Sequence, residues 1–246
     1  MGFANNLHAF GITITYFWVI PSILLPISIM YNVFGYTTDY LFNIHRLYRW
    51  YLGIKTQYVN DNKYITKGFV LGNHRALLAD NSIADANNSR CIVIARREVY
   101  FIALPYVLIG QLDGRAIIIN RNNKRSETFQ QILKYMERNV GPVGFFPEGT
   151  RLAHTHVTSI EHAKSTLKHG LLKSVYEHRK LPVQLQLSNN KEHVLNEKKM
   201  TVNHGVTVTI FISKPIYPED FSTFEDFYHE IAKQWYENWI PPTFIR

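Results

Sequence analysis

The chain has 246 residues, 46% of them apolar, so it can bury one sizeable core and lacks the low hydrophobicity of a disordered protein. Lys and Arg outnumber Asp and Glu by 27 to 19, and this net charge of +8 favours anionic partners: nucleic acid, an acidic membrane or phosphorylated substrates. A single cysteine, Cys91, excludes an internal disulfide framework and fits a reducing compartment.

The N-terminal segment is the most apolar part of the chain. Residues 9–38 contain no Asp, Glu, Lys, Arg or His, and a membrane-spanning helix needs about 20 mostly apolar residues. No basic region precedes the segment and no small-residue cleavage site follows it, which disfavours a signal peptide. Pro21 and Pro26 interrupt the run, so two readings stay open: one kinked span, or two short helices side by side in one leaflet. Both readings place the protein at a membrane.

The next segment, "HRLYRWYLGIK" at residues 45–55, mixes cationic and aromatic side chains. Such a mixture suits the lipid headgroup layer, and the positive-inside rule then directs this flank and the following domain to the cytoplasm. An amphipathic helix on the surface of the domain is the alternative. We therefore expect a membrane anchor with its flank at residues 1–58 and a catalytic domain at residues 59–246.

After residue 60, apolar β-branched runs alternate with helical patterns. The runs predict strands at residues 65–71, 91–95, 115–120, 143–146, 181–187 and 206–212, and helices at 81–86, 98–110, 126–139, 160–178 and 223–239. Residues 187–199, "LSNNKEHVLNEKK", are polar and read as a surface loop. This alternation predicts an α/β domain with a central, mostly parallel sheet flanked by helices.

The first candidate catalytic group follows the first of these strands. In "GNHRALLAD", residues 72–80, His74 lies where an open α/β sheet delivers functional groups, at the carboxyl end of a strand. A neutral imidazole can take a proton from a hydroxyl at neutral pH, and a nearby carboxylate such as that of Asp80 could orient the ring.

Two further strand ends carry guanidinium groups. "GRAIIINR", residues 114–121, ends in Arg121, and "FFPEGTR", residues 145–151, ends in Arg151. Arginine presents a planar fork of donors suited to phosphate oxygens, and Gly149 permits close backbone approach. Glu148 could hold the fork or bind substrate, and a salt-bridged turn is the bland alternative. A fourth element, "KLPVQLQ" at residues 180–186, is a strand entered through Pro182.

Together these four elements resemble the membrane-bound glycerolipid acyltransferases, typified by 1-acylglycerol-3-phosphate acyltransferase. The family's first motif, Asn-His-x4-Asp, is similar to Asn73, His74 and Asp80, and its Phe-Pro-Glu-Gly-Thr-Arg motif matches residues 146–151 at every position. Its Gly-x-Ile-Phe-Ile-x-Arg strand resembles residues 114–121, and its proline-containing strand resembles residues 181–185. The resemblance spans residues 65–220. A two-helix N-terminal membrane element is also expected in this family, which favours the second reading of residues 9–38.

The chain departs from the family pattern at one position. The family spacing places the aspartate at position 79, where this chain has Ala79, and Asp80 comes one residue late. One residue turns a helix by about 100°. Either the loop after His74 absorbs the extra residue, or the catalytic pair is broken.

The resemblance implies transfer of an acyl chain from acyl-CoA to lysophosphatidic acid, giving phosphatidic acid in phospholipid biosynthesis. His74 would be the base and Asp80 its orienting carboxylate, acyl-CoA would be a co-substrate, and neither a metal nor another cofactor is expected. Partners would be membrane lipid, acyl-CoA and a lysophospholipid acceptor. The residues implied to bind substrate are Arg121, Glu148, Gly149, Thr150 and Arg151.

Other functions stay open or are set aside. The acceptor could be glycerol-3-phosphate or another lysophospholipid in place of lysophosphatidic acid. The acyl donor could be a lysophospholipid in place of acyl-CoA, which would make the protein a transacylase. The chain could also be an inactive lipid-binding relative. His154, His156 and His162 lack a regular ligand spacing for zinc. No helix-turn-helix, zinc-finger or RNA-binding pattern appears, so nucleic acid is not an expected partner.

Overall fold

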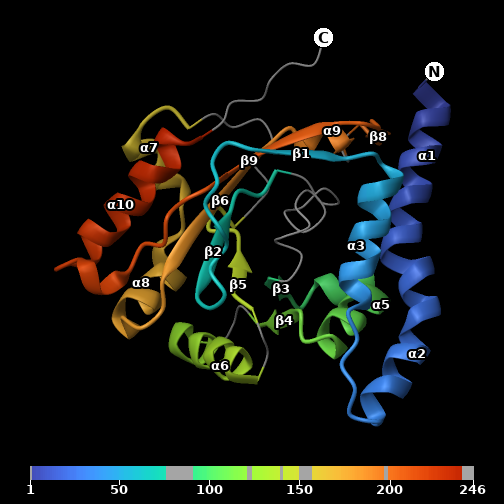
Figure 1. The fold of residues 1–246 in the computed structure, drawn as a ribbon, viewed down its shortest axis with the longest axis horizontal. Helices are drawn as coiled ribbons and strands as arrows, with labels where there is room; N and C mark the ends of the chain where they lie inside the picture. The colour runs from blue at the N-terminus through green and yellow to red at the C-terminus, as the bar shows by residue number, and fades with distance from the viewer. Residues whose placement is uncertain are drawn as a thin grey trace.

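The computed structural model describes residues 2–75, 91–120, 124–138, 141–149, 157–196 and 199–239, apart from the side chains of residues 2, 3 and 138. A seven-stranded sheet lies at the centre of the fold, with helices on both of its faces (Figure 1). Its strands, in spatial order, are β1 (Lys55–Tyr58), β9 (Thr207–Ile212), β6 (Val183–Asn189), β2 (Phe69–Gly72), β5 (Val143–Phe145), β3 (Ile92–Arg96) and β4 (Ala116–Ile119).

The five strands from β6 to β4 run parallel to one another, and β9 is antiparallel to β6. The prediction of a mostly parallel sheet flanked by helices is therefore confirmed. Parallel strands bring their carboxyl ends to one edge of the sheet, so the segments after β2, β5 and β6 meet there. A separate antiparallel pair, β7 (Leu195–Asn196) and β8 (Thr201–Val202), lies beyond β6 in the chain.

The helices fall into two groups. One group covers one sheet face: α6 (Arg125–Arg138), α7 (Ile160–Thr166), α8 (His169–His178), the 3-10 turn η3 (Pro218–Asp220) and α10 (Phe224–Glu237). The other group lies on the opposite side with the N-terminus: α1 (Gly2–Ile14), the π-helical turn η1 (Thr15–Val19), α2 (Ile20–Val33), α3 (Tyr40–Tyr51), α5 (Val99–Leu112) and the short α9 (Lys191–Val194) (Figure 1).

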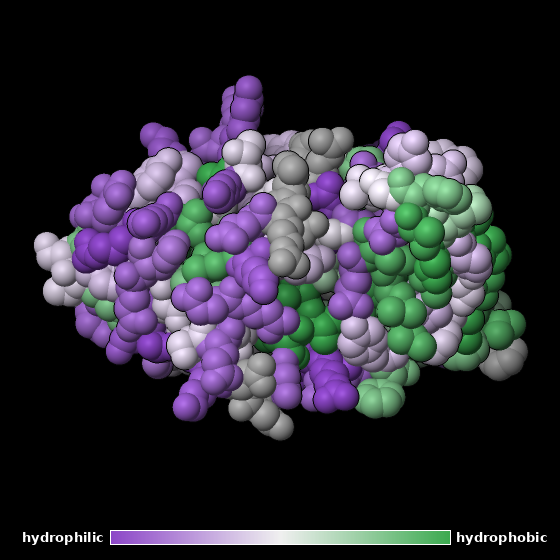
Figure 2. Space-filling model, turned by 90° about the horizontal axis from the view of Figure 1, so that it is seen from below, coloured by the Kyte–Doolittle hydropathy of each residue, from purple (hydrophilic) through white to green (hydrophobic). Residues whose placement is uncertain are grey.

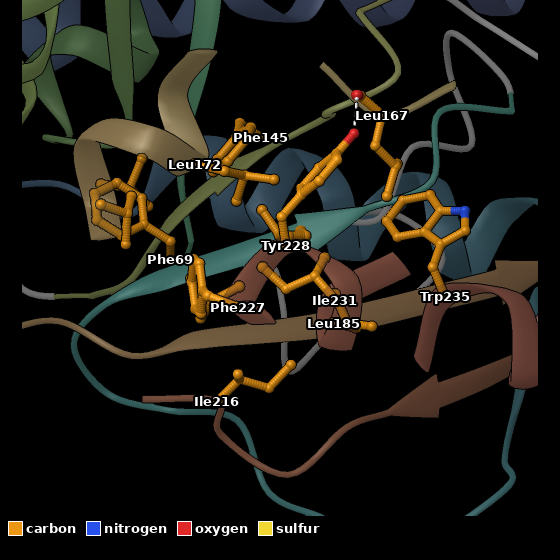
Figure 3. Packing of buried hydrophobic residues seen from close by; sticks show 14 of the residues in the cluster. Phe69, Phe145, Leu167, Leu172, Leu185, Ile216, Phe227, Tyr228, Ile231 and Trp235 are labelled. Atoms are coloured by element: carbon orange, nitrogen blue, oxygen red, sulfur yellow. Dashed lines mark hydrogen bonds between the residues drawn. The ribbon is translucent and has the colours of Figure 1, made fainter. Parts of the chain in front are cut away.

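The larger apolar core lies between the sheet and the first group of helices. Helix α10 buries Phe227, Ile231 and Trp235 at the spacing of one helical face, and all three are fully buried (Figure 3). The Tyr228 hydroxyl donates a hydrogen bond to the Leu167 carbonyl at 2.6 Å, which joins α10 to the segment between α7 and α8. This core fixes the sheet whose strand ends carry the predicted site.

A second apolar cluster joins the sheet to the N-terminal helices. It contains Ile44 and Tyr48 of α3, Ile109 of α5, and Val208 and Ile210 of β9, all nearly or fully buried. Helix α3 is therefore an amphipathic helix with one face buried against the domain. The residues predicted to lie in the headgroup layer belong to this same helix, up to Tyr51.

The N-terminal segment forms consecutive helices instead of two short helices folded side by side within residues 9–38, so that expectation was wrong. Pro21 lies in the first turn of α2, and Pro26 lies inside this helix without ending it. The π-helical turn η1 immediately before α2 accommodates an extra residue in the helical path and buries Tyr16 and Phe17. Helix Ala4–Val33 is long and apolar enough to cross a membrane by length and composition, and 28% of its most apolar window is buried. Figure 1 shows α3 returning beside it.

Three local predictions also need correction. Residues 55–58 form strand β1, paired with β9, so the expected anchor flank contributes an edge strand to the sheet. The expected helix at 160–178 is two helices, because Leu167 and Lys168 are extended and the Lys168 N–H donates to the Pro147 carbonyl at 2.8 Å. Residues 187–192 are buried and 187–189 belong to β6, so the expected surface loop at 187–199 was wrong over this part. The expected helix at 81–86 lies outside the described residues.

Candidate active site

Asn73 begins the site at the carboxyl end of the central strand β2, and its side chain is almost fully buried. Its Nδ2 donates to the Ser188 carbonyl and its Oδ1 accepts from the Ser188 N–H, both at 2.8 Å. The amide thus continues the β2–β6 pairing one residue beyond the strand. A buried amide that is satisfied on both its donor and acceptor sides holds one fixed orientation.

His74 follows directly and is partly exposed. Its ring is stacked on Phe146, with ring centroids 4.2 Å apart and planes 14° from parallel. Its backbone N–H donates to Glu148 Oε2 at 2.6 Å. The backbone and ring of His74 are therefore both held by the segment that follows β5, which is the predicted juxtaposition of the first and third motifs.

Glu148 is only 3% exposed, and its carboxylate is turned toward the His74 backbone. Burial raises its pKa from 4.5 to about 7, while the His74 N–H and the charges of Lys191 and Arg75 act to lower it. The carboxyl group therefore changes charge near neutral pH. This carboxyl group is hydrogen-bonded to the backbone of His74, the candidate base.

Two buried cations lie beside this carboxylate. The Arg75 guanidinium donates to Asn189 Oδ1 at 3.0 Å and to Glu192 Oε1 at 2.9 Å, and its Cζ lies 4.5 Å from the centroid of the Trp239 ring. Lys191, the first residue of α9, is fully buried, and its Nζ donates to the Asn73 carbonyl. Buried charges are expensive unless they have polar or charged partners: Arg75 is ion-paired with Glu192, and Lys191 is hydrogen-bonded to the Asn73 carbonyl.

Gly149 forms the outer side of the site. Its φ of +70° is a left-handed conformation that favours glycine, and an added Cβ would lie 2.8 Å from Lys168 Nζ. Arg96 of β3 donates to the Gly149 carbonyl at 2.7 Å, and both Arg96 and Lys168 are exposed. Two cationic side chains thus border the Gly149 turn, on the side open to solvent.

The structure brings His74, Glu148 and Gly149 together, as the motifs predicted. Strand β4 runs parallel to β3, so its carboxyl end at Ile119 lies at the same sheet edge, two strands from β5. The remaining predicted site residues, Asp80, Arg121, Thr150 and Arg151, lie outside the described residues.

Sequence reasoning missed the contribution of residues 188–192, which form the end of β6 and the start of α9. Their polar composition indicated a loop, yet Ser188 binds Asn73, and Asn189 and Glu192 bind Arg75. The signal was available: these residues directly follow the strand predicted at 181–187, which is the position at which the other motifs were recognised. Among the residues that the structure describes, no group of three or more His, Cys, Asp or Glu side chains could hold a metal ion.

Comparison with known proteins agrees with the fold. Residues 56–211 match the model of the acyltransferase family. Among solved structures, the fold is similar to that of the 1-acyl-sn-glycerophosphate (LPA) acyltransferase PlsC from Thermotoga maritima, with a TM-score of 0.66 over 96% of this chain and 95% of that one, at 19% sequence identity. No curated protein sequence matches this chain.

Proposed function

Because this chain belongs to the acyltransferase family, we propose that it transfers an acyl chain from acyl-CoA to the free hydroxyl of lysophosphatidic acid, giving phosphatidic acid. The observation that carries the proposal is the placement of His74. Its imidazole lies partly exposed at the carboxyl edge of the sheet, stacked on Phe146 and held through its backbone by Glu148. A general base with restricted freedom, open to a substrate, is the requirement for this reaction.

In the proposed reaction, neutral His74 removes the proton from the glycerol hydroxyl as its oxygen attacks the thioester carbonyl of acyl-CoA. Backbone N–H groups at the strand ends would stabilise the oxyanion of the tetrahedral intermediate. The carbon–sulfur bond then breaks, and the imidazolium returns the proton to the departing thiolate, which leaves as free CoA. Asp80 is proposed to orient the ring and stabilise the imidazolium. The histidine is restored at the end of the cycle, and no covalent acyl-enzyme is required.

We assign the phosphate of the acceptor to the cationic side of the Gly149 turn. Arg121 and Arg151 are proposed to bind the phosphate through charge-assisted hydrogen bonds, and Thr150 would add a hydroxyl. The exposed Arg96 and Lys168 place further positive charge at the same turn. Glu148 is proposed to serve this site through the His74 backbone, since its carboxylate is buried and already accepts that N–H.

We propose that the N-terminal helices hold this domain at the cytoplasmic side of a membrane. Figure 2 shows apolar surface gathered over the end of the molecule formed by these helices, while the opposite end is polar. The basic residues Arg46, Arg49 and Lys55 follow the apolar helix, which by the positive-inside rule directs the domain to the cytoplasm. The most exposed apolar side chains of the N-terminal helices and α5, with Phe34 directly after α2, are Leu7, Ile23, Val33, Phe34, Trp50, Phe101 and Ile102.

A second candidate is an inactive lipid-binding protein on the same scaffold. It is favoured by Ala79, which stands where the family pattern has its aspartate. One assay separates the two candidates. The full chain in detergent micelles, supplied with acyl-CoA and lysophosphatidic acid, should release free CoA and form phosphatidic acid, and His74→Ala should abolish both. Lipid binding without CoA release would favour the inactive protein.

A panel of acceptors defines the substrate within the enzyme class. CoA release with glycerol-3-phosphate or another lysophospholipid, but not with lysophosphatidic acid, would reassign the acceptor. Phosphatidic acid formed from two lysophospholipids without acyl-CoA would identify a transacylase. Asp80→Ala with wild-type turnover would remove Asp80 from the mechanism and leave the role of His74 standing.

A further inference from the structure

The peptide unit that joins Asn73 to His74 is held at both of its polar ends by buried charged side chains. Its carbonyl, that of Asn73, accepts a hydrogen bond from the Lys191 ammonium. Its N–H, that of His74, donates to the Glu148 carboxylate at 2.6 Å. Lys191 comes from α9 after β6, and Glu148 comes from the turn after β5, so the strands on either side of β2 each supply one partner.

The signs of the two charges match the dipole of this peptide. A cation lies at the negative carbonyl end, and an anion lies at the positive N–H end. Charge-assisted hydrogen bonds are roughly twice as strong as neutral ones, and in a buried site they are weakly screened. Rotation of this peptide plane would break both bonds and cost each of the two buried side chains a hydrogen bond.

The position of Lys191 is specific. It is fully buried, and its Nζ lies 5.9 Å from the centroid of the Phe146 ring, the same ring on which His74 is stacked. Asn190, which precedes it, has a φ of +67° and donates from its N–H to Asn189 Oδ1 at 2.8 Å. This local turn directs the first residue of α9 inward, toward the peptide between Asn73 and His74.

We propose that Lys191 is a positioning residue for acyl transfer: with Glu148 it fixes the plane of the peptide between Asn73 and His74, and so directs the imidazole toward the substrate hydroxyl. The inference rests on the proposed function and adds a residue to it. Because the orientation of this peptide sets the direction of the His74 Cα–Cβ bond, a small rotation would displace the ring from the hydroxyl. Displacement of a catalytic group by about 1 Å can lower a rate about 100-fold.

The proposal also predicts a pH dependence. Removal of the Lys191 cation takes away one of the charges that keep the Glu148 carboxyl ionised, so its pKa rises further above about 7. As the pH falls, the Glu148 carboxylate would then become protonated at a higher pH than in the wild type. The described groups that act on Glu148 are the His74 N–H, Arg75 and Lys191; Arg96 donates to the carbonyl of the neighbouring Gly149, and Lys168 lies beside that residue.

The test compares Lys191→Met with Val194→Ala in the full chain. Methionine keeps most of the length of lysine without the charge, whereas Val194→Ala removes buried apolar contacts from the same helix and leaves the cation in place. In the micelle assay, Lys191→Met should lower kcat by about 10- to 100-fold, with KM for lysophosphatidic acid within about twofold of wild type. The acid limb of its kcat profile should move to higher pH. Val194→Ala should change neither kcat by more than about twofold nor the acid limb.

Two results would overturn the proposal: wild-type kcat and an unchanged acid limb in Lys191→Met, or an equal loss and shift in Val194→Ala. Should Lys191→Met fail to fold, the wild-type chain still decides the question by NMR. The Lys191 ammonium should give a nitrogen resonance protected from solvent exchange, and the His74 amide shift should titrate with Glu148 and stop doing so in Glu148→Gln. A rapidly exchanging ammonium, or an amide shift independent of Glu148, contradicts the arrangement.

These NMR measurements require no substrate, so they separate the two levels of inference. A wild-type chain that shows both signals but releases no CoA retains the charged arrangement and refutes the proposed function. A wild-type chain that releases CoA without either signal supports the function and refutes the role of Lys191.

Discussion

The Glu148 carboxyl group should make stability depend on pH in a way that a neutral isostere removes. Its pKa is raised from 4.5 to about 7 by burial. One pKa unit corresponds to about 1.36 kcal/mol, so this shift corresponds to about 3 kcal/mol. Below pH 4.5 the group is protonated in the folded and unfolded states alike. As the pH rises toward 7, the unfolded chain releases the proton and the folded chain retains it.

Stability contributed by this group is therefore fully present below pH 4.5 and is lost as the pH rises through about 7. Glu148→Gln keeps an acceptor for the His74 N–H but has no proton to release. The free energy of unfolding of wild type relative to Glu148→Gln should fall by about 3 kcal/mol between pH 4 and pH 8. Other titrating groups are common to both chains and largely cancel in this difference.

Denaturant unfolding of both chains in detergent micelles, repeated at intervals across this pH range, measures the difference directly. A difference that stays constant with pH would show that Glu148 has an ordinary pKa and is not buried as described. A difference that grows in the opposite direction would show that the cations Lys191 and Arg75 outweigh desolvation, and that Glu148 is ionised throughout.

Three further predictions address other parts of the molecule. Gly149→Ala places a methyl group 2.8 Å from Lys168 Nζ at a φ of +70°. It should raise KM for lysophosphatidic acid, measured by CoA release, and lower stability by about 1–2 kcal/mol, measured by denaturant unfolding. An unchanged KM would show that this turn does not bind the acceptor. Tyr228→Phe removes a hydroxyl that bonds to the Leu167 and Lys164 carbonyls, both at 2.6 Å, and should lower stability by about 1 kcal/mol at unchanged KM; no loss would mean that water replaces the hydroxyl. Phe101, on α5, is 84% exposed, and Phe101→Ser should weaken binding to phospholipid vesicles about 10-fold in flotation assays. The control is Tyr217→Ser, at a residue 44% exposed just before η3, which should not weaken this binding. Equal effects of the two substitutions would argue against a membrane-facing α5.

The sequence alone determined the class of fold and the positions of the candidate site residues along the chain. Alternating apolar strands and helical patterns are local signals, and parallel strands deliver their following residues to one edge, so the meeting of His74 with Glu148 and Gly149 was predictable. The apolar character of residues 9–38 likewise predicted a membrane element, whereas the structure decided that Ala4–Val33 is one long helix. These features depend on residue type and spacing, which a sequence states directly.

Tertiary structure decided the features that depend on partners distant in the chain. Lys191 is buried and donates to the carbonyl of Asn73, 118 residues away, and no local pattern distinguishes such a lysine from one in a solvated loop. The break before α8 likewise depends on the bond from the Lys168 N–H to the Pro147 carbonyl, and β1 is a strand because β9 lies beside it. A polar segment is expected to be exposed unless the fold supplies buried hydrogen-bond partners for it. Which partners lie beside it depends on the order of the strands in the sheet, and the order of the motifs along the chain does not determine that strand order.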